Sequence, residues 1–381
     1  MNSKERHEKR YQRRKAKREA RKIELNRQHG DFDKIMSFDN LYTAYQKCCK
    51  GVNWKASTQR YRVNALLNVN NAHRRLQEGR YKSGGFVEFY ITERGKRRHI
   101  KSVHINERVI QRCLCDFALI PMLAPTFIYD NTACLKYKGI DFAIRRLTCH
   151  MQRHYRKHGT EGYALVIDFS KYFDRIQHKP IFDELDRRFT DKRIVNLARE
   201  FIKDFGDGMS LGLGSQVSQV MALAYPNKLD HFIKSVLRIK HYARYMDDSY
   251  LIHPSKEYLQ HCLAEITKIC DSLGIVLNPR KTQIVKLSRG ITFLKTRFNL
   301  TDTGKIIKRP NKRSIVVMRR KLKTFRRWVD RGQIEFADVK ISYQSWKGHV
   351  GRRSAYHTTQ NMDALFYRLF EVEIHGGILK L

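Results

Sequence analysis

The chain has 381 residues, a hydrophobic content of 41% and a formal net charge of +39, from 76 Lys and Arg residues against 37 Asp and Glu residues. This length favours two or three subdomains over one small core, and the apolar content excludes an intrinsically disordered chain. Because solubility does not need so large a positive charge, the composition indicates a polyanionic partner, most simply nucleic acid.

The sequence gives no indication of secretion or of a membrane. Residues 1–22 are rich in Lys and Arg and lack the apolar segment of a signal peptide. The longest apolar stretch, residues 115–129, carries Asp116 and two prolines and is too short to span a bilayer. The eight cysteines contain no Cys-x-x-Cys pair, which argues against a zinc knuckle and against a disulfide framework. We therefore expect reduced thiols, a cytoplasmic location and no membrane partner.

The first 35 residues predict a basic N-terminal arm. Glu5 and Lys9 have the i, i+4 order that supports a helix. Such an arm is either a solvated helix or a segment that lies on a phosphate backbone and becomes ordered there. Further along, the spacing of apolar residues predicts helices up to Gly79, and residues 84–103 predict two strands around a turn at Arg94–Gly95.

Acidic residues follow the next predicted strands. Residues 164–167 form an apolar run, and Asp168 is the first polar residue after it. Residues 241–253, HYARYMDDSYLIH, predict a strand, a turn that carries Asp247 and Asp248, and a second strand. A helix then runs to Gly274. If the buried strand and this hairpin are neighbours in one sheet, three carboxylates converge.

Two carboxylates about 4 Å apart repel each other by about 4 kcal/mol at an effective dielectric constant near 20. One interpretation is a solvated turn. The other is a site for Mg²⁺, with Mn²⁺ as the alternative ion, because both metals prefer oxygen ligands. Two such ions, roughly 3.5–4 Å apart, would activate a 3′-hydroxyl and neutralise a leaving pyrophosphate.

The motif YMDD at 245–248 resembles the catalytic box of reverse transcriptases, and DFSKYFD at 168–174 resembles the first metal-binding motif of that family. The resemblance covers roughly residues 40–300 and is closest, in motif pattern, to prokaryotic enzymes of diversity-generating retroelements and of defence-associated groups. It implies that Asp168 and Asp247 bind both metals, with Phe169 in the metal site and Asp248 assisting.

The resemblance also implies an α+β fold of the right-hand polymerase type. We expect a basic arm at 1–35, fingers of helices and a β-hairpin at 36–160, and a palm with the catalytic motifs at 161–305. Part of the fingers would be inserted at about 178–208, and a basic helical thumb would occupy 306–381.

Several residues match the family positions that contact the incoming deoxynucleotide. Phe173 falls at the steric gate, where an aromatic ring excludes a 2′-hydroxyl, and Tyr172 precedes it. Arg98, or else Arg97, would clamp the triphosphate, since Arg suits a bidentate phosphate contact. Lys138 would add a further phosphate contact. The alternatives are a core aromatic ring for Phe173 and a general nucleic-acid-facing charge for the basic residues.

The next motif departs from the family pattern. Most relatives have Gln–Gly and then Ser–Pro, whereas this chain has Leu213–Gly214 and then Ser218–Gln219. In the retroelement group an aliphatic residue at the first position accompanies error-prone copying, and we extend that to Leu213 as a hypothesis. Downstream, Lys281 resembles the family lysine that sits near the triphosphate and could give a proton to pyrophosphate.

Other residues match positions that contact the template and the primer. Residues 289–298 resemble the primer-grip hairpin, and helices after residue 311 would lie on the RNA–DNA duplex. The predicted nucleic-acid contacts are Tyr245, Met246, Gln219, Trp346, Lys347, Arg352 and Arg353, although Trp346 could equally belong to the core.

These features predict a reverse transcriptase that makes DNA from dNTPs on an RNA template by two-metal phosphoryl transfer. The expected setting is a bacterial or phage system for antiphage defence or for diversification, with a dedicated structured non-coding RNA, a cDNA product and an accessory protein as partners. Two alternatives stay open. One is an RNA-binding splicing or assembly factor with a polymerase-like fold, and the other is an RNA-dependent RNA polymerase, which Phe173 disfavours.

Overall fold

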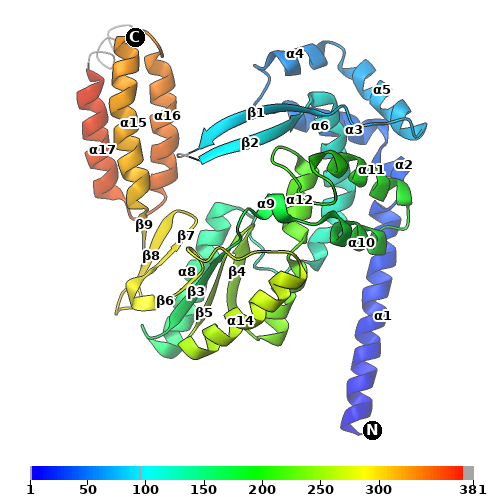
Figure 1. Ribbon diagram of the computed structural model, residues 1–381, viewed down its shortest axis with the longest axis horizontal. Helices are drawn as coiled ribbons and strands as arrows, with labels where there is room; N and C mark the ends of the chain where they lie inside the picture. Colours follow the sequence, from blue (N-terminus) through cyan, green and yellow to red (C-terminus); the bar gives the residue numbers. More distant parts are fainter. Residues whose placement is uncertain (1, 94–95, 372–381) are drawn as a thin grey trace.

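The computed structural model describes residues 2–93 and 96–371, which form a long helical arm, a central body and a separate helical bundle (Figure 1). The predicted turn at Arg94–Gly95 lies outside the described residues. All eight cysteines are free thiols. The strands are antiparallel and helices surround them, so the predicted α+β class is observed.

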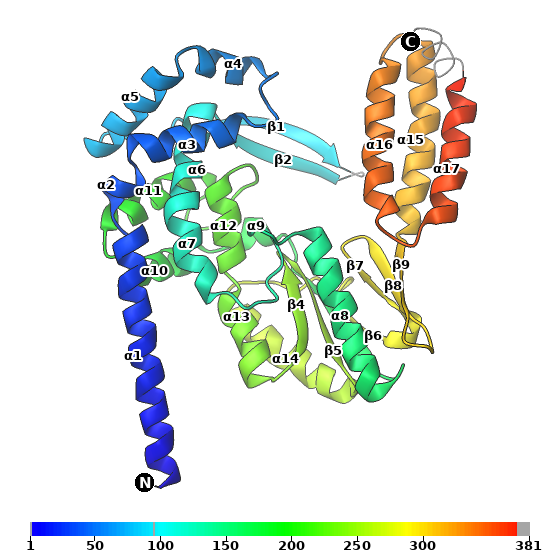
Figure 2. The same ribbon diagram turned by 180° about the vertical axis from the view of Figure 1, so that it is seen from behind.

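The arm is helix α1 (Ser3–His29), which begins at a capping box. The Asn2 side chain accepts a hydrogen bond from the Glu5 amide, and the Glu5 carboxylate accepts one from the Asn2 amide. Only the last two turns reach the body, where Asn26 donates to the carbonyl oxygen of Arg188 at 2.7 Å. Figures 1 and 2 both show the rest of α1 extending away from the body.

The predicted fingers contain a group of helices and one β-hairpin. Their elements are α2 (Phe32–Ile35), α3 (Phe38–Cys49), α4 (Ala56–Val63), α5 (Ala65–Gln77), β1 (Phe86–Glu93), β2 (Lys96–Val103), α6 (Ile105–Leu114), the π-helical turn η1 (Cys115–Leu119), α7 (Ile120–Leu123) and η2 (Ala124–Thr126). Leu41 of α3 and Val69 of α5 are fully buried with residues of α6 and η1, which fixes the helices to one another.

Within the part of the chain that the structure describes, one helical stretch, Ile105–Thr126, is long and apolar enough to cross a membrane by length and composition. The same test is passed by helices of a protein core. Val109, Leu114 and Ala118 of this stretch are fully buried among neighbouring helices, so it serves here as a core helix.

The predicted palm contains a four-stranded antiparallel sheet in the order β4-β5-β3-β6. Its strands are β3 (Tyr163–Asp168), β4 (His241–Tyr245), β5 (Asp248–His253) and β6 (Gln283–Lys286). Side chains alternate across a sheet. Accordingly, Leu165 and Leu251 pack with helix α14 (Lys256–Ser272) on one face, whereas Ala164 and Ile252 pack with helix α8 (Ile140–His158) on the other.

Between β3 and β4 the chain forms a helical insertion that packs back toward the fingers. Its elements are α9 (Tyr172–Arg175), α10 (His178–Arg188), α11 (Lys192–Ile202), η3 (Lys203–Phe205), α12 (Gln216–Ala224), α13 (Asn227–His231) and the π-helical turn η4 (Phe232–Val236). Buried residues of α10, α11 and α12 share one core with α6, so the fingers and the palm sheet have a continuous interior.

The C-terminal part has a small sheet and then a helical bundle. After η5 (Leu287–Arg289), strands β7 (Ile291–Phe293), β8 (Thr296–Leu300) and β9 (Ile306–Pro310) form an antiparallel sheet that packs on α8. Helices α15 (Lys312–Asp330), α16 (Phe336–Gly351) and α17 (Tyr356–Leu369) then enclose a core of their own around Leu322 and Met362. The predicted domain boundaries stay a prediction.

Candidate active site

A cleft of about 1720 Å³ opens between the β1–β2 hairpin, the palm sheet and the helical bundle. It gathers side chains from segments far apart in the sequence, and Figure 1 shows where the β1–β2 hairpin, the sheet with β3 and β5, and helices α15 and α16 lie. The predicted site residues that line it are Arg97, Arg98, Asp168, Phe169, Tyr172, Phe173, Leu213, Tyr245, Met246, Asp247, Asp248, Lys281 and Trp346. The structure therefore brings most of the predicted site together.

The three predicted carboxylates meet at one end of the palm sheet. Asp168, the last residue of β3, lies directly opposite Asp248, the first residue of β5, in the antiparallel register. The Phe169 amide donates to the carbonyl oxygen of Asp247 at 3.3 Å, which ties the turn to the end of β3. The convergence that the sequence could only suggest follows from this register.

Basic and polar side chains hold Asp168, which is only 5% exposed. The Lys281 ammonium lies 2.5 Å from one carboxylate oxygen, and the Asn278 side-chain amide donates to the other at 3.1 Å. Burial lowers the pKa of Lys281, but the hydrogen bond and the charge of Asp168 outweigh that effect, so this pKa lies above its ordinary value. Lys281 thus carries its proton at neutral pH.

The two aspartates of the hairpin are short of positive charge. Burial, together with the charges of Asp247 and Asp168, raises the pKa of Asp248 to about 7. Burial and the charge of Asp168 also raise the pKa of Asp247, although Lys281 and Arg98 act in the opposite direction. Burial is the largest cause of both shifts and the neighbouring carboxylates add to it, so a cation bound beside these groups would lower both pKa values.

This donor set fits a hard divalent cation. Carboxylate oxygens are the ligands that Mg²⁺ and Mn²⁺ prefer, and the site has an excess of negative charge. In this structure the positive charge nearest Asp168 is the Lys281 ammonium, which forms an ion pair with it. The side chain of Phe169 is buried in the core, so only its backbone carbonyl could contribute. Among the described residues no three His, Cys, Asp or Glu side chains stand in ligand geometry, and the metal site stays a prediction.

The predicted steric gate lies beside the carboxylates. Phe173 is half-buried on the cleft wall and packs edge-on against Tyr172, with ring centroids 5.8 Å apart. Tyr172 itself is buried, and its hydroxyl donates to the Ala222 carbonyl oxygen at 2.6 Å. The Tyr172 hydroxyl is therefore occupied inside the protein, whereas the Phe173 ring faces the cleft.

The motif that departs from the family pattern, at Leu213–Gly214, forms a loop that joins Phe173 to strand β2 of the predicted fingers. The Leu211 amide donates to the Phe173 carbonyl oxygen, and the Lys101 amide donates to the Leu213 carbonyl oxygen, both at 2.9 Å. Gly214 has φ +126°, and a Cβ there would stand 2.5 Å from the Lys101 carbonyl oxygen, so glycine is required for this close approach. The backbone of Leu213 is thus fixed while its side chain lines the cleft.

The predicted phosphate-binding residues divide into two groups. Arg98 lies near enough for its charge to lower the pKa of Asp247, and Arg97 stacks on the Tyr90 ring, 3.9 Å from its centroid. Both arginines line the cleft. The Lys138 ammonium instead donates to the carbonyl oxygens of Tyr129 and Asn131, at 2.8 and 3.0 Å. The structure does not bring Lys138 to the cleft wall, and its phosphate contact stays a prediction.

The predicted template and primer contacts of the palm also divide. Tyr245 and Met246 line the cleft, and Met246 has the left-handed φ of +54° that turns the chain toward Asp247. Gln219 is exposed on α12 and does not line the cleft.

The predicted contacts of the helical bundle are placed differently from one another. Trp346 lines the cleft, and its indole nitrogen is buried without a hydrogen-bond partner among the described residues. Lys347 pairs with Asp363 inside the bundle, and Arg352 pairs with Asp141 of α8 at 2.5 Å. Arg353 is buried and donates to the Thr296 hydroxyl at 2.7 Å. In this structure Trp346 is therefore the one of these four that faces the cleft.

Sequence reasoning missed several lining residues. Asn278 begins the turn that carries Lys281, and its place before Pro279 is a sequence signal, since an Asn before Pro favours a turn and an Asn side chain bonds nearby backbone groups. Lys295, at φ +61°, sits in the turn between β7 and β8. Met318, Lys321 and His349 come from α15 and α16, and no local pattern distinguishes them from other positions of a basic helix.

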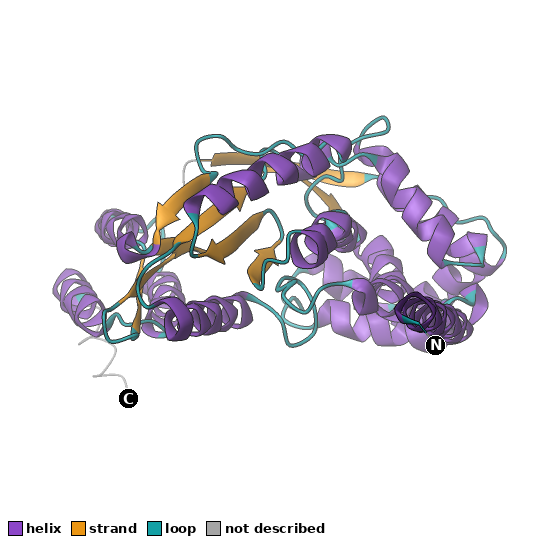
Figure 3. Ribbon diagram, turned by 90° about the horizontal axis from the view of Figure 1, so that it is seen from below, coloured by secondary structure: helices purple, strands orange, loops and turns teal. Residues whose placement is uncertain are grey.

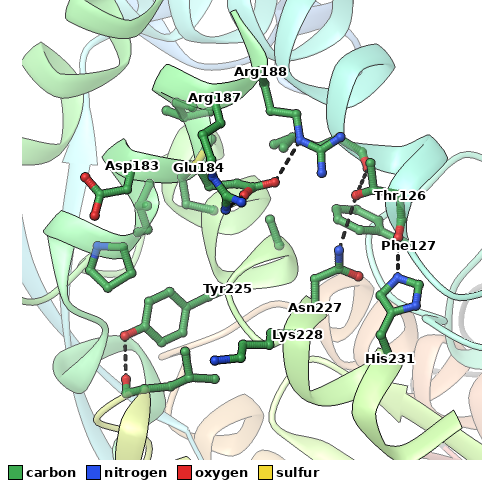
Figure 4. Close-up of a pocket in the computed structure, with 17 residues that line it drawn as sticks. Thr126, Phe127, Asp183, Glu184, Arg187, Arg188, Tyr225, Asn227, Lys228 and His231 are labelled. Carbon is green, nitrogen blue, oxygen red and sulfur yellow. Dashed lines mark hydrogen bonds and ion pairs between the residues drawn. The ribbon is translucent and has the colours of Figure 1, made fainter. Parts of the chain in front are cut away.

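A second pocket, of about 580 Å³, lies between α7, α10, α12 and α13 (Figure 4). Apolar side chains make most of its wall. Figure 4 shows Arg188 turned toward Glu184 and His231 turned toward Thr126, at hydrogen-bond distances of 2.7 and 2.8 Å. None of the predicted site residues lines this pocket, and on its rim Glu184 pairs with Arg187 and Arg188.

Residues 91–298 match the family described as reverse transcriptase (RNA-dependent DNA polymerase). The match covers more than half of the chain, so the chain belongs to the reverse transcriptase family. The predicted family and the α+β polymerase fold are thereby confirmed, whereas the prokaryotic subgroup stays a prediction.

Solved structures with a detectable likeness include three telomerase structures from two Candida species, each 13% identical to this chain. Telomerase from Candida albicans in complex with the TWJ fragment of telomeric RNA has a TM-score of 0.48 over 66% of this chain and 51% of its own. Apo telomerase from Candida tropicalis has a TM-score of 0.47 over 60% of this chain and 48% of its own. Its form truncated from the C-terminal domain has a TM-score of 0.43 over 64% of this chain and 60% of its own. The chain thus spans about half to three fifths of these structures. No curated protein matches the sequence.

Proposed function

We propose that this chain synthesises DNA on an RNA template from deoxynucleoside triphosphates. The observation that carries the proposal is the antiparallel register that sets Asp168 opposite Asp248, with Asp247 on the adjoining turn, at the floor of a large cleft. Membership of the reverse transcriptase family supports the same reaction.

The residues of the cleft suit phosphoryl transfer, which depends on positioning and on charge neutralisation. Asp168, Asp247 and Asp248, with the Phe169 carbonyl, would hold two divalent ions. When bound, such ions supply Lewis-acid activation of a 3′-hydroxyl and neutralise the charge on the leaving pyrophosphate.

The chain's own groups then act around the nucleotide. Arg98 and Arg97 would bind the triphosphate from the fingers, because guanidinium groups match phosphate geometry. The Phe173 ring would lie against the sugar and exclude a 2′-hydroxyl. Lys281, protonated beside Asp168, would stand where it can transfer a proton to pyrophosphate.

Primer extension on an RNA template tests the proposal. We expect extension with dNTPs and at least tenfold slower extension with NTPs, because one steric clash of ~1.4 kcal/mol already changes a rate tenfold. The variant Asp247→Ala with Asp248→Ala should lose extension by at least about a thousandfold, since it removes two of three metal-ligand candidates. Asp271→Ala, on the exposed side of α14, is the matched control and should retain full activity.

Each alternative has its own outcome. Extension with NTPs as fast as with dNTPs would identify an RNA-dependent RNA polymerase. If the double variant loses extension but retains its biological activity, the chain acts as an RNA-binding assembly or splicing factor.

We further propose a setting for this reaction, supported by the Leu213–Gly214 and Ser218–Gln219 variant of the motif. The template would be a dedicated structured non-coding RNA in a bacterial or phage system for defence or diversification, with an accessory protein, in the cytoplasm. Purification of the protein from its host, followed by sequencing of the bound RNA and cDNA, tests this. Scattered adenine mutations would indicate diversification and concatemeric products defence, whereas absence of bound RNA would contradict the proposal.

A further inference from the structure

Helix α1 presents a continuous row of basic side chains that no other part of the described chain covers. Residues 2–24 are all exposed, and α1 has no buried residue. The row, called here the α1 basic stripe, recurs at spacings of three and four, so its members share one face of a helix. It consists of Arg6, Lys9, Arg10, Arg13, Arg14, Lys17 and Arg21.

The opposite face of α1 has a different character. It carries Glu5, Glu8 and Glu19, and Gln12 donates to Glu8 at 2.6 Å. The seven stripe residues therefore form a face that is basic throughout, whereas on the other side Lys4, Lys15 and Lys22 are interspersed with these glutamates. A helix of 27 residues with a rise of 1.5 Å per residue is ~40 Å long, so the stripe is an extended and nearly straight charged surface.

The position of α1 separates this stripe from the cleft. Figures 1 and 2 show α1 leaving the body below the fingers, while the helical bundle that closes the cleft lies at the opposite corner. Figure 3, seen from below, shows α1 nearly end-on at the end of the molecule away from the bundle. No residue of α1 lines the cleft. A duplex held in the cleft is therefore not the natural partner of the stripe.

The chemistry of α1 favours a double-helical phosphate backbone over other anionic surfaces. A membrane-bound helix needs an apolar face, and the large apolar residues of α1 are only Tyr11, Ile23 and Leu25. Proteins that bind single strands stack bases on aromatic rings, and Tyr11 is the sole aromatic residue of α1. Rows of Lys and Arg without base-reading groups instead contact phosphates and give affinity without sequence specificity.

The basic residues of the stripe also repel one another, and bound phosphates would reduce that repulsion. Arg10 and Arg14, Arg13 and Lys17, and Lys17 and Arg21 are like-charged pairs at i, i+4, and such pairs destabilise a helix. Tertiary packing stabilises most protein helices, and α1 lacks it over six turns. Neutralisation by phosphates would therefore increase the helical content of α1.

We infer that the α1 basic stripe binds a double-helical segment of RNA outside the catalytic cleft. This rests on the proposed function only in taking RNA, rather than DNA, as the source of the duplex. The stripe would hold a structured part of the template RNA while a single-stranded part occupies the cleft, so binding at α1 and synthesis at Asp247 are separate events.

Two triple variants with equal loss of charge test the inference. Arg10→Gln, Lys17→Gln and Arg21→Gln alter the stripe, whereas Lys4→Gln, Lys15→Gln and Lys22→Gln alter basic residues on the other side of the same helix. Glutamine has a helix propensity close to those of Lys and Arg, so neither set of substitutions lowers the intrinsic helix propensity of α1 appreciably. Equal unfolding temperatures of the two variants and the unaltered chain would confirm that the body is intact.

The measurement is binding of the full chain to a fluorescent RNA hairpin of ~20 base pairs, across a salt series, with a short unlabelled primer–template saturating the cleft. The stripe variant should bind at least about tenfold more weakly, and its slope of log affinity on log salt should fall by about 2–3, because each lost phosphate contact removes ~0.9. The control variant should bind within about twofold of the unaltered chain. Circular dichroism should show added helix on hairpin binding, except in the stripe variant.

Equal weakening in both variants, or tighter binding of a DNA hairpin than of the RNA hairpin, would overturn the inference. Primer extension on the short primer–template distinguishes a failure of the stripe inference from a failure of the proposed function. If the unaltered chain fails to extend the primer, the proposed function fails while hairpin binding still tests the stripe. If extension proceeds and the two variants bind alike, the stripe inference fails alone.

Discussion

Arg244 links the protein interior to the turn that carries Asp247. Its side chain is fully buried and pairs with Asp230, with nitrogen–oxygen distances of 2.7 and 2.8 Å. It also donates to the carbonyl oxygens of Met246 and Leu223, each at 3.0 Å. Because Met246 adopts a left-handed φ of +54°, which a side chain disfavours, this hydrogen bond fixes a turn that would otherwise relax.

We therefore predict that Arg244→Lys lowers kcat for primer extension by roughly tenfold to a hundredfold with little change in KM, since a shift of about 1 Å at a reacting group has that effect. Lysine keeps the charge opposite Asp230 but lacks the fork that reaches both carbonyl oxygens. Single-turnover kinetics measure the effect, with Arg145→Lys on the exposed face of α8 as control. A proportional rise in KM with unchanged kcat would contradict this positioning role.

Leu213 allows a test of fidelity because its backbone and its side chain are separately constrained. The Leu213 carbonyl oxygen accepts from Lys101, and that bond does not depend on the side chain. Leu213→Gln should place an amide in the cleft and lower the misincorporation frequency by roughly fivefold, the equivalent of one hydrogen bond of ~1 kcal/mol. Sequencing of extension products measures it, and an unchanged error frequency would refute the hypothesis.

At the scale of elements, helix α8 and the palm sheet meet around a buried histidine. His150 is 1% exposed; its Nδ1 lies 2.9 Å from the Tyr250 hydroxyl, and Arg146 donates to its Nε2 at 3.0 Å. Because Nε2 accepts that hydrogen bond, the ring is neutral. Burial lowers the pKa of His150 to about 3, although Asp130 acts in the opposite direction, and Lys234, Arg146 and His241 reinforce the shift.

This neutral histidine predicts a loss of stability in acid. Above about pH 6.5 the His150 side chain is neutral in the folded and unfolded states alike, so its full contribution to the free energy of unfolding is present. As the pH falls from about 6.5 to 3, only the unfolded chain takes up the proton, and the free energy of unfolding falls by up to ~1.4 kcal/mol per pH unit for this group. The pKa of His241, lowered by burial to about 4, adds a decrease of the same sign.

Denaturant unfolding between pH 7 and pH 4 measures this dependence. His150→Gln can keep both hydrogen bonds and cannot titrate. The free energy of unfolding of this variant should therefore fall less steeply with decreasing pH, because the contribution of one titrating group is gone. An equally steep decrease in His150→Gln would show that other groups cause the acid sensitivity.

The elements themselves were largely predictable, and the directions of individual side chains were not. The apolar run before Asp168 and the alternation around Asp247 predicted β3, β4 and β5 because each pattern is local. Lys138 was expected to contact the phosphates of the incoming nucleotide and Arg353 to contact nucleic acid, but the structure turns both toward internal carbonyl or hydroxyl groups. Charge in a sequence does not reveal which basic residue has an internal acceptor, since the acceptor comes from a distant segment.

At the scale of the whole molecule, the cleft exists only while the helical bundle keeps its place over the palm. Two neighbouring arginines join these parts in different ways. Arg353 donates from a buried position to the Thr296 hydroxyl of β8, at 2.7 Å, and to the carbonyl oxygen of His349. Arg352 pairs with Asp141 of α8, and both of those side chains are more than half exposed.

The two arginines therefore form a matched pair for a test of bundle position. Arg353→Lys should lower the free energy of unfolding by about 1–3 kcal/mol, because a buried acceptor loses its partner. Arg352→Lys should change it by less than about 1 kcal/mol, as is usual for an exposed ion pair. Thermal and denaturant unfolding measure both.

The same pair predicts an effect on synthesis. If Arg353 fixes the bundle against β8, then Arg353→Lys loosens one wall of the cleft, and the chain releases its duplex sooner. Products made in a single binding event, with a trap for released enzyme, should shorten about twofold or more in Arg353→Lys, as ~0.5–1 kcal/mol of weaker retention implies. They should keep their length in Arg352→Lys. Shortening in Arg352→Lys alone would mean that the exposed arginine contacts the duplex and that the buried one has no part in retaining it.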